Sequence, residues 1–114
     1  MDKLDSKLRE LIITFRKLRD PVSGCPWDKE QDFKSIASCA IEESYEVADA
    51  IEREDFEDLK AELGDLLFQI VFHSEMAKEE DLFTIEDVID ELNSKLIRRH
   101  PHVFNDGNVK DAKD

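Results

Sequence analysis

The segment that decides the fold is DFEDLKAELGDLLFQIVFHSEMAK, residues 55–78, the most apolar stretch of the chain. Its apolar residues recur three and four positions apart, which predicts one long helix. When successive residues are placed at about 100° around the helix axis, apolar side chains cover nearly the whole circumference. The exception is a polar stripe formed by Glu62, Asp65, Gln69 and His73. The segment therefore sets carboxylates within an otherwise apolar surface.

The chain before this segment predicts one helix and a loop. Residues 2–19 carry apolar side chains at helical spacing, which indicates an amphipathic helix. Three residues that interrupt helices follow closely, Pro21, Gly24 and Pro26. The stretch DPVSGCPWD, residues 20–28, is therefore predicted to be a loop, and it contains Trp27, the only tryptophan.

Two further helices are predicted from their starting signals. One runs from residue 32 to residue 53, with Asp28 or Asp32 as its candidate N-cap. The other begins after Thr84, because Asp87 three residues later is placed to complete a capping box. It is expected to end near residue 99, before a proline.

The composition suits one helical domain. A chain of 114 residues is too short for two independent cores. Hydrophobic residues make up 40% and charged residues 39%, with only three Gly and three Pro, which favours a compact helical protein over a sandwich or a disordered chain. We predict an all-α, four-helix bundle-like domain over residues 1–106 and a frayed tail over residues 107–114.

The charge balance excludes one class of partner and suggests another. Asp and Glu number 29 against 16 Lys and Arg, which gives a net charge of −13. A nucleic acid backbone would be repelled by this surface, so no nucleic acid partner is expected. Clustered carboxylates without basic partners do attract hard divalent cations.

The two cysteines and the hydropathy pattern predict a location. Cys25 and Cys39 lack a CxxC spacing, and no stretch resembles a signal peptide or an apolar run long enough to span a bilayer. A reducing cytoplasm is the expected location, with no membrane contact. Cys39 falls in a helical pattern among small residues, which is typical of an inert, buried cysteine.

Acidic pairs on two predicted helices point at a metal site. In IEESYEVADA, residues 41–50, Glu43 and Glu46 lie at the border between the apolar and the acidic face. Glu62 and Asp65 repeat the same three-residue spacing, which directs two carboxylates from one turn toward a common point. Two such helices side by side would give four oxygen ligands, suited to Mg²⁺, with Mn²⁺ as the alternative ion.

Other interpretations of these acids stay open at this level. ExxE and ExxD spacings are common in acidic helices, so a solvated groove or a set of salt bridges is also compatible with the pattern. A di-iron carboxylate bundle is not, because it requires Glu-x-x-His pairs. The residues three positions before the three histidines are Ile70, Ile97 and Arg99.

Four motifs in order resemble the MazG family of nucleoside triphosphate pyrophosphohydrolases: CPWDKEQ, EESYEVADAI, ELGDLLFQIVFH and KLIRRHPHVF. This family lies within an all-α superfamily that includes the dimeric dUTPase-like enzymes. The resemblance covers residues 8–106. The core motif of the family, EExxE followed by ExxD, is matched by Glu42, Glu43, Glu46, Glu62 and Asp65.

The resemblance implies a housecleaning enzyme that hydrolyses the α,β-phosphoanhydride of an NTP or dNTP to the monophosphate and pyrophosphate with Mg²⁺. It also implies that the metal ligands are Glu43, Glu46, Glu62 and Asp65. Glu42 is interpreted as a residue that supports these ligands or as the base that activates water. Two further residues close to the ligands in sequence are expected to line the nucleotide pocket, Ser38 and Cys39.

Basic and aromatic residues complete the predicted site. A triphosphate carries about four negative charges, so an acidic protein can bind it only through a metal and a local basic patch. Lys95 and Arg99 are four residues apart on the last predicted helix, and Arg98 is adjacent. Compensation of the helix dipole is the other interpretation of this cluster, and the resemblance favours phosphate contact. Trp27 is expected either to cover the core or to stack on the base.

One more apolar surface predicts self-association. Phe68, Phe72 and Met76 continue the apolar surface of residues 55–78 beyond what one chain is expected to cover. We therefore predict a homodimer or homotetramer joined through these residues. The alternative to an enzyme is a catalytically silent module that senses nucleotides or binds proteins. No residue of the motifs addresses base or sugar preference.

Overall fold

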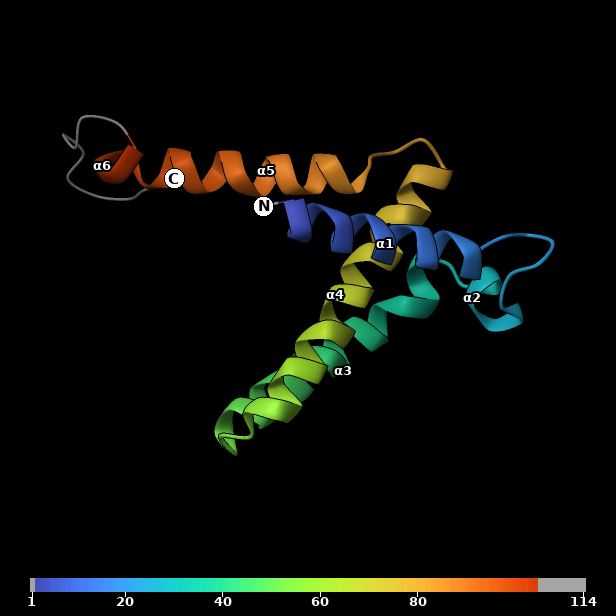
Figure 1. The fold of residues 1–114 in the computed structure, drawn as a ribbon, viewed down its shortest axis with the longest axis horizontal. Helices are drawn as coiled ribbons and strands as arrows, with labels where there is room; N and C mark the ends of the chain where they lie inside the picture. Colours follow the sequence, from blue (N-terminus) through green and yellow to red (C-terminus); the bar gives the residue numbers. More distant parts are fainter. Residues whose placement is uncertain (1, 105–114) are drawn as a thin grey trace.

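The computed structural model describes residues 2–104, and these form six helices and no strand (Figure 1). The helices are α1 (Asp2–Leu18), α2 (Pro26–Glu30), α3 (Phe33–Glu52), α4 (Phe56–Glu79), α5 (Ile85–Arg99) and α6 (Pro101–Phe104). The all-α prediction is confirmed, and the four long helices match their predicted positions closely. The predicted tail lies outside the described residues. Among the residues described, no helix combines the length and the apolarity that crossing a membrane requires.

Side-chain caps fix where the long helices begin. The Asp32 side chain accepts a hydrogen bond from the Ser35 backbone N–H at 2.8 Å, and the Ser35 hydroxyl accepts one from the Asp32 N–H at 2.9 Å. The same reciprocal arrangement joins Thr84 and Asp87 at the start of α5. Each cap satisfies backbone donors that the first helical turn leaves unpaired. Asp32 is thus the N-cap, and the predicted box at Thr84 is confirmed.

Two short helices were not predicted. The predicted loop contains α2, which begins at Pro26 and carries Trp27. Proline suits the first position of a helix, because it has no N–H to leave unpaired and its φ angle is already helical. The second short helix, α6, likewise begins at Pro101. In both places the proline starts a helix, so the prediction of loop throughout residues 20–28 was wrong.

The core lies where α1 crosses the C-terminal half of α4 (Figure 1). Phe15 of α1 packs edge to face against Phe72 and Phe68 of α4, with ring centroids 4.8 Å and 5.7 Å apart. Phe72 is 0% exposed and Met76 is 2% exposed. The prediction that Phe68, Phe72 and Met76 are left for another copy was therefore wrong, because α1 of the same chain covers this face.

The four long helices do not close into a bundle within one chain. α3 and α4 pack side by side as an antiparallel hairpin, whereas α5 leaves the C-terminal end of α4 and runs away from this hairpin (Figure 1). The radius of gyration is 17.3 Å, against about 13 Å for a compact domain of this length. As a result, α4 keeps an exposed apolar stripe of Leu63, Leu67 and Ile70, each more than 40% exposed.

Candidate metal centre

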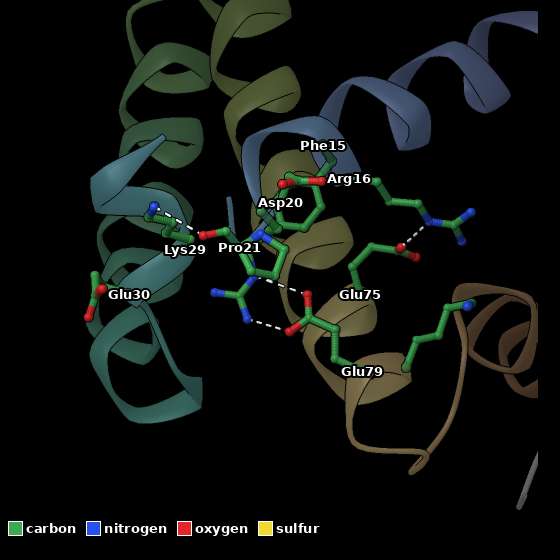
Figure 2. A pocket seen from close by; sticks show the side chains of 10 residues that line it. Phe15, Arg16, Asp20, Pro21, Lys29, Glu30, Glu75 and Glu79 are labelled. Carbon is green, nitrogen blue, oxygen red and sulfur yellow. Dashed lines mark hydrogen bonds and ion pairs between the residues drawn. The ribbon is translucent and has the colours of Figure 1, made fainter. Parts of the chain in front are cut away.

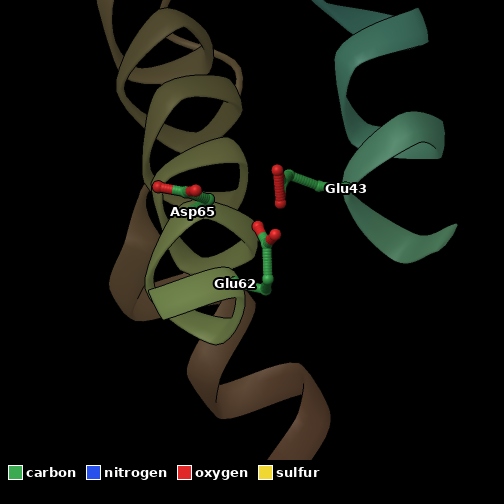
Figure 3. Close-up of side chains that lie close together, drawn as sticks. All are labelled: Glu43, Glu62 and Asp65. Atoms are coloured by element: carbon green, nitrogen blue, oxygen red, sulfur yellow. The ribbon is translucent and has the colours of Figure 1, made fainter. Parts of the chain in front are cut away.

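Glu43 of α3 extends toward Glu62 of α4, and Asp65 lies one turn further along α4 (Figure 3). One carboxylate oxygen from each residue lies within 4.8 Å of the other two. Glu43 and Glu62 are half-buried, and Asp65 is exposed. The three carboxylates, called the acid cluster below, thus come from both helices of the hairpin and open to solvent on one side.

The basic side chains that lie near the acid cluster in the sequence form ion pairs with other acids. Arg53 forms ion pairs with Asp49, Asp55 and Asp58 at the α3–α4 turn, and Lys60 pairs with Glu57. Glu43 Oε2 is buried and has no hydrogen-bond donor. Removing an ionised carboxylate from water is costly unless a cation or a donor replaces the water. Within residues 2–104, Arg53 and Lys60 are therefore paired with acids outside the acid cluster.

Burial and the crowding of these carboxylates raise the pKa of Glu62. Partial burial, a hydrogen bond that its protonated form makes to Glu43, and the nearby negative charges of Glu43, Asp58 and Glu46 raise the pKa of Glu62 from 4.5 to about 7. Closely spaced carboxylates cannot all ionise without a compensating charge. Without a cation, Glu62 therefore holds its proton more tightly than an ordinary glutamate does.

The donor set fits a hard divalent cation. Carboxylate oxygens are the ligands that Mg²⁺ and Mn²⁺ take, and Mg²⁺ retains several waters beside one or two carboxylates. The exposed side of the acid cluster leaves space for such waters, and the unpaired Glu43 oxygen supplies a ligand atom. Glu46 is not part of the group within 4.8 Å, but its charge is near enough to raise the pKa of Glu62. Glu42 is exposed beside Glu43 on α3.

The structure does not bring the predicted basic patch to the acids of the same chain. Lys95, Arg98 and Arg99 lie in the C-terminal part of α5. This part of α5 lies far from the middle of the α3–α4 hairpin, where the acid cluster is found (Figure 1). Lys95 is half-buried, and both arginines are exposed.

The other predicted pocket residues lie on two elements. Ser38 is exposed and Cys39 is half-buried on α3, one turn before Glu42 and Glu43. Cys39 is a free thiol, and it is less buried than predicted. Trp27 of α2 contacts the Phe72 ring edge to face at 6.3 Å and is 53% exposed. Trp27 therefore covers part of the core and still presents an open surface.

A second polar region at the other end of α4 was not predicted. A cavity of about 730 Å³ lies between α1, α2 and the last turns of α4 (Figure 2). Two ion pairs cross it, Arg16 to Glu75 at 2.6 Å and Arg19 to Glu79 at 2.5 Å. Glu75 stands in an apolar stretch of the sequence, which signals a buried acid. Nothing in the local pattern identifies a partner on α1.

Comparisons with known proteins place the chain in a family. The model of the MazG nucleotide pyrophosphohydrolase domain matches residues 31–104. A nucleoside triphosphate pyrophosphohydrolase of Escherichia coli is 51% identical over 109 residues, 96% of this chain and 41% of that protein. A nucleoside triphosphate pyrophosphohydrolase/pyrophosphatase MazG of Thermotoga maritima is 53% identical over 97 residues, 85% of this chain and 38% of that protein.

The fold agrees with a solved structure as well. The crystal structure of a mazG-related protein from Thermotoga maritima superposes with a TM-score of 0.70 at 26% identity, over 92% of this chain and 87% of that one. The chain spans about two fifths of the length of the two curated relatives. Matched in sequence over most of its length and in fold over nearly all of it, the chain belongs to the MazG nucleotide pyrophosphohydrolase domain family.

Proposed function

We propose that this chain hydrolyses nucleoside triphosphates, ribo or deoxy, at the α,β-phosphoanhydride, and that it releases the monophosphate and pyrophosphate with Mg²⁺. The observation that carries this proposal is the acid cluster, in which carboxylates of Glu43, Glu62 and Asp65 meet without a cation and one buried oxygen has no partner. An acidic protein with such a cluster can bind a polyphosphate through a metal and a local basic patch.

The acidic residues have separate roles in this proposal. Glu43, Glu46, Glu62 and Asp65 hold the metal, which when bound neutralises phosphate charge and polarises the phosphoryl oxygens. Glu62 must be deprotonated to act as a ligand, so its raised pKa makes metal binding weaker below about pH 7. Glu42 is exposed next to Glu43, where its carboxylate can accept a proton from an attacking water.

The basic residues are proposed to come from a second copy of the chain. Lys95, Arg98 and Arg99 lie on the part of α5 that points away from the acids of its own chain. In a homodimer or homotetramer, this end of α5 can reach the acid cluster of another copy and bind the triphosphate, where arginine contacts phosphate through two N–H groups. The surface that would join the copies is the exposed stripe of Leu63, Leu67 and Ile70.

Trp27 is proposed to stack on the base, and Ser38 and Cys39 to line the pocket beside the ligands. Phe72, which Trp27 contacts, is seven residues after Asp65. This spacing places it on the same face of α4, about 10 Å along the axis. A nucleotide whose phosphates lie at the acid cluster would therefore extend toward Trp27.

The test is a screen of the eight common NTPs and dNTPs with Mg²⁺, in which both products are identified by chromatography. We expect equal amounts of monophosphate and pyrophosphate, and none after EDTA treatment. Release of single phosphates would contradict cleavage at the α,β bond. Nucleotide binding without any turnover would favour the silent binding module.

A mixing experiment tests the second copy. Glu43→Gln and Arg99→Ala are each expected to be weakly active alone. If the site draws on two copies, refolding the two variants together restores activity, because one of the two sites in a mixed dimer has both intact partners. No recovery in the mixture would contradict an active site shared between copies.

A further inference from the structure

We propose that Arg19 is a positioning residue that holds α2, and with it Trp27, in place for the nucleobase. The proposal rests on the proposed function, in which Trp27 stacks on the base. Arg19 touches neither the acid cluster nor the expected path of the phosphates, so it would act only through the element that it holds.

The guanidinium of Arg19, the residue that follows α1, contacts both α2 and α4. Its side chain is only 11% exposed. Nη1 donates hydrogen bonds to the backbone carbonyls of Asp28 and Gln31, at 2.8 Å and 2.9 Å. Nε and Nη2 donate to the Glu79 carboxylate at 3.1 Å and 2.5 Å. One side chain at the end of α1, from the residue that follows Leu18, thus ties the end of α2 to the end of α4.

The carbonyls that Arg19 binds are those that α2 cannot satisfy itself. α2 has five residues, and the last carbonyls of any helix lack partners within it. A helix this short is not stable without outside contacts. Arg19 therefore supplies both the cap and the attachment for the C-terminal end of α2.

The Arg19 guanidinium and the Trp27 indole both contact the ring of Phe72. The Arg19 guanidinium carbon lies 5.6 Å from the centre of the Phe72 ring, and Trp27 meets that ring at 6.3 Å. The Trp27 carbonyl accepts a hydrogen bond from Gln31 Nε2 at 2.9 Å. The indole contacts Phe72, and Trp27 as a whole is 53% exposed, so surface remains open for stacking on a ligand.

The start of α2 is fixed independently of Arg19. The Cys25 N–H donates to the Leu18 carbonyl, and the Gly24 N–H donates to the Asp20 carbonyl, both at 2.9 Å. A Cβ on Gly24 would lie 2.4 Å from each of these two carbonyl oxygens, so the turn accepts only glycine. Loss of Arg19 is therefore expected to loosen the end of α2 while the chain still folds.

Arg16 provides a matched control. It lies in the last turn of α1, three residues before Arg19, and also pairs with a glutamate of α4, Glu75, at 2.6 Å. No hydrogen bond to α2 is found for Arg16 among the described residues. Lysine at either position keeps the charge for the ion pair but lacks the planar fork that binds two carbonyls. Arg19→Lys should therefore disturb α2, and Arg16→Lys should not.

The experiment compares Arg19→Lys and Arg16→Lys with the natural chain. For Arg19→Lys we expect a roughly tenfold rise in the KM for a nucleoside triphosphate, as for a weakened base stack, with kcat within about twofold. Acrylamide quenching of fluorescence should increase, and the signal is unambiguous because Trp27 is the only tryptophan. Arg16→Lys should leave KM, kcat and quenching unchanged.

A double variant shows whether Arg19 acts through Trp27. Trp27→Ala should raise KM by itself, and adding Arg19→Lys should raise it no further. Additive effects would overturn the proposal, as would equal effects of Arg19→Lys and Arg16→Lys, or a fall in kcat with KM unchanged. If Arg19→Lys does not fold, Glu79→Gln, which frees one side of the guanidinium, must raise quenching for the proposal to stand.

The failure of the proposed function would look different. A natural chain that releases no pyrophosphate contradicts the enzyme, whereas the dissociation constant of a non-hydrolysable triphosphate and the quenching of Trp27 still test the role of Arg19. Unchanged affinity and quenching in Arg19→Lys, with an active natural chain, would overturn this inference alone.

Discussion

The two halves of α4 handle buried acids in opposite ways. In the C-terminal half, Glu75 is 3% exposed, and it pairs with Arg16 of α1 at 2.6 Å (Figure 2). In the N-terminal half, Glu62 meets Glu43 of α3 and Asp65 (Figure 3). The nearby Lys60 pairs with Glu57 instead of with these acids. The same helix thus contains a neutralised acid and an uncompensated group of acids.

The two halves of α4 therefore have different roles, one in packing and one in the proposed site. A buried acid that has its own arginine contributes to the packing of α1 on α4, and breaking such a pair is destabilising. A group of acids without a cation lowers the stability of the folded chain, and the proposed function gives this group a metal ion as its counter-charge. Under the proposed function the acid cluster is therefore the metal site. Glu75 belongs to the core, where its Oε1 pairs with Arg16 and its Oε2 has no hydrogen-bond partner.

The largest effect is expected for Glu43→Gln. Loss of this ligand should lower turnover by roughly three orders of magnitude, since a catalytic metal contributes several kcal/mol of transition-state stabilisation. In EDTA the variant should melt no lower than the natural chain, because one of the repelling charges is gone. Calorimetric Mg²⁺ titration and thermal melting check both statements.

Glu75→Gln is the control for this comparison. It should melt lower, because Arg16 loses its charged partner, and its Mg²⁺ affinity should be unchanged. Natural turnover in Glu43→Gln, or a loss of Mg²⁺ binding in Glu75→Gln, would reverse the roles assigned to the two halves.

Phe72→Ala should destabilise the fold more than any change in the N-terminal half. Phe72 is 0% exposed between Phe15 and Phe68, and removing a buried phenylalanine costs about 3–5 kcal/mol. Urea unfolding measures this loss. The free energy of unfolding should change by much less for Glu62→Gln, and an equal change would show that both halves serve the core.

Leu67→Glu should weaken the association between copies by about 3 kcal/mol, because an uncompensated charge would be buried between them. Leu67 is 42% exposed in one chain and lies in the stripe proposed to join the copies. Sedimentation velocity at micromolar concentration should show oligomers for the natural chain and monomers for the variant. A natural chain that is monomeric and active would contradict the shared site.

Arg99→Ala should reduce catalytic efficiency on triphosphates by roughly ten- to a hundredfold, the effect of losing one charged contact of about 1.5–3 kcal/mol. Its melting temperature and Mg²⁺ affinity should stay the same, because Arg99 is exposed and lies away from the acids of its own chain. Unchanged kinetics would mean that this turn only compensates the dipole of α5.

The smallest effect concerns pH. The pKa of Glu62 is about 7 in the folded chain against an ordinary value of 4.5, so between these values the folded state binds more protons than the unfolded state. The metal-free chain should therefore lose stability as pH rises through this window. Melting at pH 5.5 and pH 8 in EDTA checks it. Glu62→Gln should show a smaller difference, and an undiminished one would assign the effect to other groups.

Much of the fold follows from local pattern, and the exceptions have a common cause. The caps at Asp32 and Thr84 are confirmed because each involves residues three positions apart. The short helix at Pro26 was missed because its end is held by the Arg19 side chain, which lies 9 and 12 positions away from the two carbonyls it binds. The face of Phe72 was assigned to a second copy because Phe15, which covers it, is 57 positions away (72 minus 15).

The sequence by itself determined the helices, their caps and the three-residue spacing that aims two acids from one turn, because these depend on neighbours within a few residues. Only the tertiary structure decided which acids meet, that Arg16 pairs with Glu75 across 59 positions, and that α5 runs away from the acids of its own chain. The reason is physical. A helix pattern gives the direction of a side chain around its own axis, whereas the partner of that side chain depends on how separate helices bury their apolar faces together.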